Sequence, residues 1–167
     1  DSRDQGKNIG TWLDATTLQL TKDINKDIVI QANNITLNGD GHTITGPGYG
    51  YGIYLYNRTG ARITNCLVQN FSYGIALFAS SNNIISSNTV ISNNFKAIYI
   101  EMGSNNHIRN NTVNSIINYG ITLDTTSNNY VANNTVTSTD GNAIQLSVAQ
   151  NNTIINNKTS LNTGNGI

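Results

Sequence analysis

Hydrophobic and polar residues alternate along most of this chain in short runs. In Ile98-Tyr99-Ile100 and in Ile121-Thr122-Leu123, an apolar residue stands at every second position, and Asn, Ser or Gly closes such runs within three to five residues. A period of two is typical of short β-strands with one buried face, and the pattern lacks stretches with the longer period of a helix. The alternation therefore predicts an all-β protein.

The runs recur with a period of 23 residues. The segment 81–90, SNNIISSNTV, returns as SNNHIRNNTV at 104–113, as SNNYVANNTV at 127–136 and as QNNTIINNKT at 150–159. A second motif, Gly/Ala-Ile-x-Leu/Ile, keeps the same spacing and begins at residues 74, 97, 120 and 143. Two motifs that recur in step indicate one structural unit repeated along the chain.

Three short strands fit into each repeat. One contains the Gly/Ala-Ile motif, and the other two are centred on positions such as Ile85 and Val90. A unit of this size cannot bury its own apolar face, but coils stacked about 4.8 Å apart can bury it together. The sequence therefore predicts a single-stranded parallel β-helix with 22 to 23 residues per coil, right-handed by the general rule for parallel crossovers.

We expect one domain. Residues 1–31 lack the repeat and are predicted to form an N-terminal cap with the first strands, while residues 32–167 form the coils. Trp12 and Leu13 are expected to cover the first coil, because an open sheet edge invites association. The sequence stops at Gly166-Ile167, the first half of another strand. We therefore expect either further coils in a parent chain or head-to-tail self-association into a filament.

The motifs resemble a known family of repeat proteins. The segment 33–46, NNITLNGDGHTITG, is followed by YGIYL at 51–55, by YGIAL at 73–77 and by the SNN repeats. Over residues 27–167 this arrangement is similar to the β-helix proteins grouped as NosD-like and as carbohydrate-binding and sugar hydrolase (CASH) domains. The resemblance implies a pectin-lyase-like solenoid, and many Asn-rich members are surface or secreted proteins of methanogenic archaea and other microbes. Members include polysaccharide lyases, periplasmic accessory proteins and surface modules, so the resemblance indicates the fold and leaves the activity open.

Composition and charge limit the classes of partner and the location that we expect for this chain. Nine basic and nine acidic residues give a net charge of zero, so we expect no nucleic-acid partner. No apolar run reaches the length of a membrane span. The chain contains 30 Asn and the single Cys66, which excludes an internal disulfide. It begins at Asp1 without Met, which is compatible with signal-peptide removal and an extracellular or cell-surface location.

Asparagine recurs at one corner of the predicted coils. The positions that we expect to form a structural ladder are Asn88, Asn111, Asn134 and Asn157. Their side-chain amides would bond from coil to coil and satisfy the backbone of the turns. Several Asn-x-Ser/Thr triplets arise from this repeat, and only Asn57-Arg58-Thr59, in a predicted turn, is a plausible glycan acceptor.

One face of the predicted helix gathers aromatic residues around the Gly/Ala-Ile-x-Leu strands. The candidate carbohydrate-binding residues are Tyr51, Tyr54, Tyr56, Tyr73, Tyr99 and Tyr119. Sugar rings stack their C–H faces on aromatic rings and bond through their hydroxyl groups. Tyrosine is also a good strand former on a half-exposed surface, and the pattern leaves both explanations open.

Glu101 and Asp124 form the acidic pair that the register would bring close together. They are the candidate catalytic residues if the protein is an enzyme, because glycosidases use two carboxylates. A pectate lyase needs in addition an acidic calcium cluster and a basic residue, whereas Lys96 falls on a different ladder from this pair. We expect no metal and no cofactor, since the potential soft ligands lack ligand spacing. The potential soft metal ligands are His42, Cys66, Met102 and His107.

We interpret the chain as a non-enzymatic, extracellular structural or adhesive module of a cell-surface or surface-layer protein. In this interpretation it binds carbohydrate on the tyrosine-rich face or assembles end to end. The alternative from another class is a polysaccharide lyase or glycoside hydrolase of the pectin-lyase-like type, which would use Glu101 and Asp124.

Overall fold

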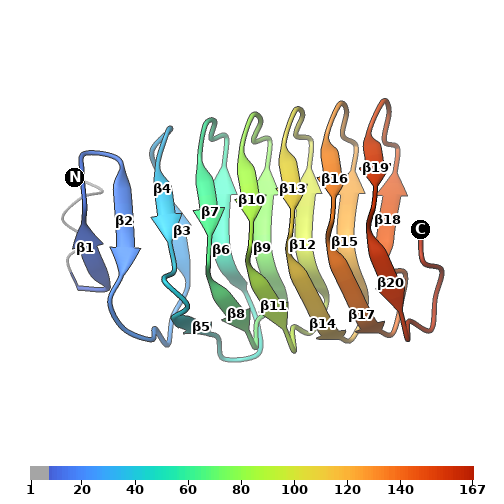
Figure 1. Ribbon diagram of the computed structural model, residues 1–167, viewed down its shortest axis with the longest axis horizontal. Helices are drawn as coiled ribbons and strands as arrows, with labels where there is room; N and C mark the ends of the chain where they lie inside the picture. The colour runs from blue at the N-terminus through green and yellow to red at the C-terminus, as the bar shows by residue number, and fades with distance from the viewer. Residues whose placement is uncertain (1–7) are drawn as a thin grey trace.

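The protein is a solenoid of stacked coils (Figure 1). The computed structural model describes residues 8–167, except for the side chains of Ser115, Ile116 and Ser138. Over the described range the chain forms twenty β-strands and no helix. Strands of successive coils pair in parallel, for example β9 with β12, so the predicted parallel β-helix is confirmed.

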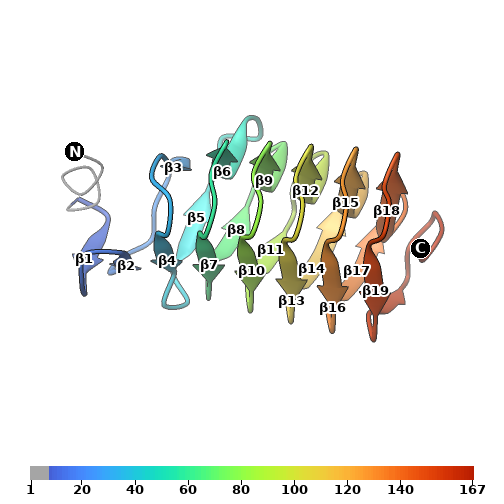
Figure 2. The same cartoon turned by 90° about the horizontal axis from the view of Figure 1, so that it is seen from above.

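Three sheets run along the axis of the solenoid, and Figure 2 shows their strands stacked side by side when seen from above. Across sheet A the strands are β1 (Gly10–Trp12), β2 (Thr17–Leu20), β4 (Thr36–Asn38), β7 (Arg62–Thr64), β10 (Ile84–Ser86), β13 (His107–Arg109), β16 (Tyr130–Ala132) and β19 (Thr153–Ile155). Sheet B consists of β5 (Thr43–Thr45), β8 (Leu67–Gln69), β11 (Thr89–Ile91), β14 (Thr112–Ile116), β17 (Thr135–Thr139) and β20 (Lys158–Ser160). Sheet C consists of β3 (Ile28–Ile30), β6 (Tyr51–Tyr56), β9 (Tyr73–Phe78), β12 (Lys96–Glu101), β15 (Tyr119–Asp124) and β18 (Ile144–Ser147).

The core consists of ladders of identical or similar apolar residues. In sheet C, Ile98 pairs with Ile75 of the preceding coil and Ile121 of the next, and all three are fully buried. Inward residues of sheets A and B, such as Ile85 and Val90, join the same hydrophobic cluster. Each coil thus covers the apolar face of its neighbour, which explains how repeats of 23 residues gain a common core.

The two asparagines of each SNN motif have different roles. The first one forms the turn, because Asn tolerates the left-handed conformation better than other non-Gly residues. Asn82 and Asn105, for example, have φ angles of 59° and 56°. The second one points inward and is buried, as at Asn83 and Asn106. This division explains why the pair recurs in every repeat.

Two asparagine ladders connect the coils. In the expected one, Asn88 Nδ2 donates to Asn111 Oδ1 at 3.1 Å, and Asn111 Nδ2 donates to Asn134 Oδ1 at 3.0 Å. Asn134 continues the series to Asn157 at 2.9 Å. A second ladder, which the repeat pattern did not predict, is built in the same way and consists of Asn83, Asn106, Asn129 and Asn152.

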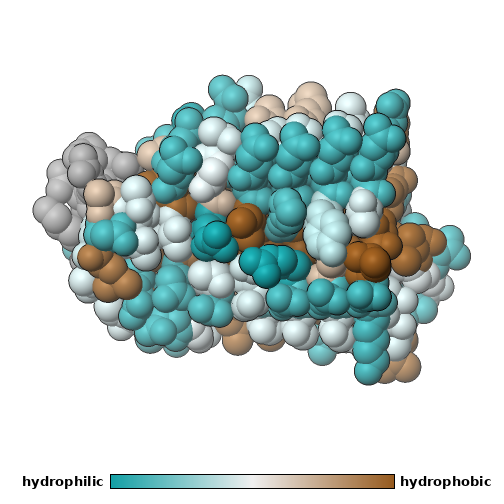
Figure 3. All heavy atoms as spheres, turned by 45° about the horizontal axis from the view of Figure 1, so that its top comes forward, coloured by the Kyte–Doolittle hydropathy of each residue, from teal (hydrophilic) through white to brown (hydrophobic). Residues whose placement is uncertain are grey.

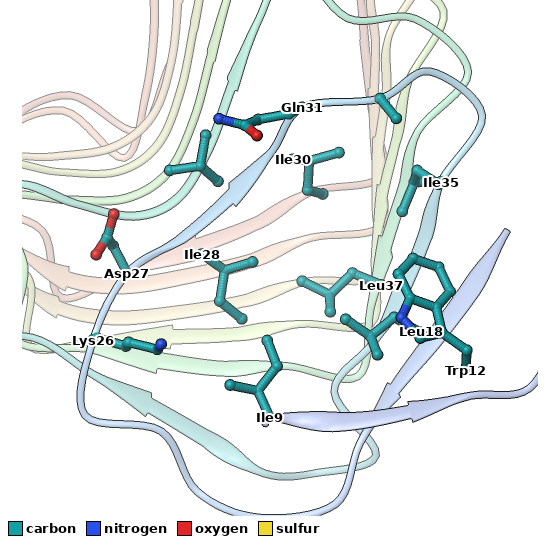
Figure 4. Close-up of a pocket in the computed structure, with 12 residues that line it drawn as sticks. Ile9, Trp12, Leu18, Lys26, Asp27, Ile28, Ile30, Gln31, Ile35 and Leu37 are labelled. Atoms are coloured by element: carbon teal, nitrogen blue, oxygen red, sulfur yellow. The ribbon is translucent and has the colours of Figure 1, made fainter. Parts of the chain in front are cut away.

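The N-terminal end of the solenoid is capped by β1. This strand pairs antiparallel with β2, whereas the following pairs of sheet A are parallel. Trp12 packs against the core, as expected. The expectation does not hold for Leu13, which is 59% exposed because it lies in the turn where its N–H bonds Thr17 O. A cavity of about 140 Å³ opens between this cap and β3, and Figure 4 shows Leu18 and Ile28 among its lining residues.

Candidate functional site

The outer face of sheet C carries three rows of side chains, because its strands lie in register. The row at the start of the strands is Tyr51, Tyr73, Lys96 and Tyr119. The middle row is Tyr54, Ala76, Tyr99, Thr122 and Gln145. The row at the ends of the strands is Tyr56, Phe78, Glu101, Asp124 and Ser147. Most of the rings of this face therefore lie over β6, β9 and β12, whereas the middle and end rows are polar over β15 and β18.

Six rings form one continuous cluster on this face, which we call the aromatic cluster: Tyr51, Tyr54, Tyr73, Phe78, Phe95 and Tyr99. The ring centroid of Tyr51 lies 4.9 Å from that of Tyr54 and 5.0 Å from that of Tyr73. Tyr73 continues the cluster to Tyr99 at 5.6 Å. The small Ala76 lies fully buried in the middle row between these rings. The cluster is a preformed apolar surface on the outside of the solenoid.

The six tyrosines predicted for this face differ in exposure. Tyr51, Tyr54, Tyr73 and Tyr119 are half-buried, and Tyr56 is 58% exposed. Tyr99 points outward but is only 6% exposed. Its ring packs inside the cluster and contributes little exposed surface, and a role in sugar binding stays a prediction for this residue. Phe78 and Phe95 complete the cluster and are not among the six predicted binding residues.

Glu101 and Asp124 lie side by side at the edge of the cluster. They are partners in the β12–β15 register. The Tyr99 hydroxyl lies 3.0 Å from Glu101 Oε2 and 3.4 Å from Asp124 Oδ2, so it donates to this pair. Burial and these carboxylates raise the pKa of Tyr99 above its usual value, which keeps the hydroxyl protonated as a donor. The Thr125 hydroxyl donates to Asp124 Oδ1 at 3.2 Å.

Lys96 also belongs to this site, although its ladder position alone gave no sign of it. Its Nζ lies 3.7 Å from the ring centroid of Tyr99 and 5.2 Å from that of Phe95, within the range of a cation–π contact. Burial lowers the pKa of Lys96, while the charges of Asp124 and Glu101 act in the opposite direction. The ammonium group therefore lies over the Tyr99 ring, near enough to the carboxylate pair for their charges to act on its pKa.

Thr122 and Gln145 are the next residues of the middle row after Tyr99. Thr122 is 2% exposed, and its Oγ1 has no hydrogen-bond partner among the described residues. The Oε1 of Gln145 is also buried without a partner in the described part of the chain. Buried polar atoms normally have a hydrogen-bond partner. Thr122 Oγ1 and Gln145 Oε1 are therefore unusual, and both lie on the part of the face over β15 and β18.

Sheet A has a different outer face. His107 and Tyr130 lie there with ring centroids 5.6 Å apart. In Figure 3, hydrophilic residues form a row across the coils, and hydrophobic residues gather toward the C-terminal end. Exposed apolar residues in that region are Leu146, Val148, Ile155 and Leu161.

Asn57, the predicted glycan acceptor, is exposed in the turn after β6 with a φ angle of 53°, and its glycosylation remains a prediction.

The potential soft metal ligands do not converge. The described residues contain no group of three or more His, Cys, Asp and Glu side chains that could hold a metal ion. Cys66 is buried, and burial raises the pKa of its thiol to about 12. His42 Nδ1 lies 3.2 Å from Asp23 Oδ1, whereas His107 faces Tyr130 on sheet A. This donor set does not fit a copper centre, which needs several soft or imidazole ligands together.

Comparison with known proteins points to one family. A family model described as "Periplasmic copper-binding protein (NosD)" matches residues 18–167, in agreement with the resemblance seen in the repeats. Searches of curated proteins and of solved structures find no match. Within the described residues, no helix is long and apolar enough to cross a membrane.

Proposed function

The chain belongs to the NosD family, and from this premise we propose that it is a non-enzymatic β-helix module that binds carbohydrate on the outer face of sheet C. The description of the family as periplasmic supports a location in the cell envelope or outside the cell. We do not extend copper binding to this chain, because its soft ligands lie apart. A structural or adhesive role at a cell surface or in a surface layer agrees with the continuous stack of coils.

The aromatic cluster is the observation that carries this proposal. Half-exposed rings of Tyr51, Tyr54 and Tyr73 form a continuous surface across β6 and β9, with centroids 4.9 to 5.0 Å apart. Such a surface suits the C–H faces of sugar rings. Glu101 and Asp124, at the border of the cluster, are acceptors for sugar hydroxyl groups. An apolar platform with a few fixed polar groups is the usual composition of a small-molecule binding surface.

Binding to a glycan array, followed by titration of the best ligand, tests the proposal. The Tyr51→Ala and Tyr73→Ala variants should each raise Kd about tenfold or more, because aromatic anchors dominate binding free energy. Tyr130→Ala, on the outer face of sheet A, is the matched control and should bind like the wild type. Equal binding by all four proteins would remove the cluster as the site.

Polysaccharide cleavage is the second candidate function, since the register does bring Glu101 and Asp124 together. A glycosidase needs two carboxylates at a defined separation, one of them protonated to serve as an acid. Here the Tyr99 hydroxyl already bonds this pair. Incubation with neutral and acidic polysaccharides separates the candidates. New reducing ends or unsaturated products that disappear in Glu101→Gln would favour the enzyme over the binding module.

A further inference from the structure

We propose that Thr122, Gln145, Glu101 and Asp124 form a polar subsite that accepts hydroxyl groups of a neutral sugar, next to the aromatic cluster. This inference rests on the proposed function and specifies its ligand class. It starts from the part of the sheet C face over β15 and β18 where the middle and end rows carry polar side chains and no rings.

The hydroxyl of Thr122 is the first observation. Thr122 faces outward between two inward core residues, Ile121 and Leu123, yet it is 98% buried by its neighbours, since only 2% of it is exposed. Its Oγ1 has no partner in the described structure. A buried hydroxyl group is normally satisfied by protein, water or ligand, so this hydroxyl group is available to bond a group from outside the chain.

The neighbours of Thr122 are the second observation. Gln145 follows it in the middle row, with an Oε1 that is also buried and unpartnered among the described residues. Asp124 lies two residues further along β15 on the same face, beside Glu101. These side chains offer acceptor oxygens, and the Thr122 hydroxyl can both donate and accept. A partner rich in hydroxyl donors matches this set.

The charges of the subsite select against acidic sugars. Glu101 and Asp124 contribute two negative charges and Lys96 one positive charge, so the formal sum is −1. A uronate carboxylate would face two like charges at short range, which is unfavourable, whereas a neutral sugar brings no charge to repel. The ammonium group of Lys96 in turn disfavours a free metal cation at the same oxygens.

Lys96 supplies a hydrogen-bond donor beside this part of the face. Its side chain reaches over the Tyr99 ring, 3.7 Å from the ring centroid. Rotation of a half-exposed lysine side chain is fast and costs little compared with moving a packed ring. The ammonium group can therefore leave the Tyr99 ring and donate to a hydroxyl group of the bound sugar.

Thr122→Val tests the subsite, because valine keeps the shape of threonine and removes only the hydroxyl. Thr126→Val is a matched control. Thr126 is also buried, at 4% exposure, with an unpartnered Oγ1, but it lies beyond the end of β15. The probes are mannan as a neutral polysaccharide and polygalacturonate as an acidic one. Melting temperatures of both variants should not fall, since neither hydroxyl has a partner to lose.

We expect the wild type to bind mannan in preference to polygalacturonate. Thr122→Val should raise Kd for mannan roughly fivefold, the effect of losing one neutral hydrogen bond, and Thr126→Val should leave it unchanged. Wild-type affinity of Thr122→Val, with binding still lost in Tyr51→Ala, would overturn the subsite and leave the proposed function intact. Preference for polygalacturonate, or loss of binding in EDTA, would overturn the neutral-sugar assignment. Absence of binding to any glycan would overturn both proposals.

Discussion

At the scale of single residues, backbone conformation determines which side chains suit the turns. The residue after each sheet C strand from β6 to β18 has a positive φ angle, for example 53° at Asn57 and 48° at Val148. Asparagine tolerates this conformation, whereas a β-branched residue adopts it only at a cost in free energy. Val148 is 75% exposed and contributes little packing in return.

Val148→Asn should therefore raise the free energy of unfolding by ~1 kcal/mol, the lower end of the cost of a left-handed residue. Urea denaturation measures the change. Val148→Ile is the control, since it keeps the branched side chain and should give no gain. A Val148→Asn variant no more stable than the isoleucine variant would contradict the strain assigned to this turn.

The raised pKa of Tyr99 leads us to expect that the stability of the protein depends on pH. Burial and the neighbouring carboxylates raise its pKa in the folded protein, so the native state keeps this proton where the unfolded chain loses it. The corresponding stabilisation is present below the unfolded pKa of about 10 and is lost as the pH rises above it. Tyr99→Phe should show a smaller loss of stability than the wild type between neutral pH and pH ~11. Parallel curves for the two proteins would show that Tyr99 does not cause the effect.

The sequence predicts the role of a residue where that role depends on its position in a ladder. It does not predict roles that depend on the conformation of a long side chain or on the bulk of neighbouring side chains. The alternation identified the inward and outward positions, including Ile121 and Thr122. It could not show that Lys96 extends to Tyr99, because this contact depends on a side-chain conformation. It also could not show that Thr122 is buried, because the bulk of its neighbours covers an outward position.

At the scale of elements, buried asparagines connect one coil to the next. Asn111 accepts hydrogen bonds from the N–H and Nδ2 of Asn88, and it donates to Ile85 O and Asn134 Oδ1. Asn111→Ala should lower the free energy of unfolding by about 2–4 kcal/mol, because it leaves several buried polar groups unpaired. Chemical denaturation measures this change.

The control for the ladder is Asn110→Gly at the neighbouring exposed turn. Asn110 has a φ angle of 57°, which glycine also adopts, so this variant should change stability by only a few tenths of a kcal/mol. If Asn111→Ala is no less stable than Asn110→Gly, the hydrogen bonds between coils contribute little.

The sequence predicted the asparagine ladder that contains Asn88 but not the one that contains Asn83, and the difference has a physical reason. Asn is both a turn former and a ladder former, and the adjacent pair in SNN contains one of each. Asn82 lies in the left-handed turn conformation, whereas Asn83 is buried and bonds Asn106. Only the backbone conformation separates these two roles.

At the scale of the whole molecule, β1 blocks one edge of the solenoid. It pairs antiparallel with β2 and so covers the edge of sheet A. Such a strand prevents continuation by another parallel coil. This feature bears on the head-to-tail association that the sequence led us to expect, since a second copy could extend sheet A here only if β1 leaves β2. The antiparallel direction of β1 was not predictable, because this short segment carries no repeat.

Deletion of residues 1–12 should therefore promote association through the uncovered edge of β2. Light scattering after size-exclusion chromatography should show larger, concentration-dependent species for the shortened chain than for the full chain, with circular dichroism as the check that the coils persist. A folded, shortened chain with the same mass distribution as the full chain would contradict a protective role for β1.

The central claim is that glycan binds the aromatic cluster, and the ring resonances of the wild-type protein test it most directly. In an NMR titration with mannose oligosaccharides, we predict shifts for the exposed rings of Tyr51, Tyr54 and Tyr73. The rings of His107 and Tyr130 on sheet A should remain unchanged. Shifts confined to the sheet A rings, or no shifts under conditions where binding is measured independently, would contradict the account.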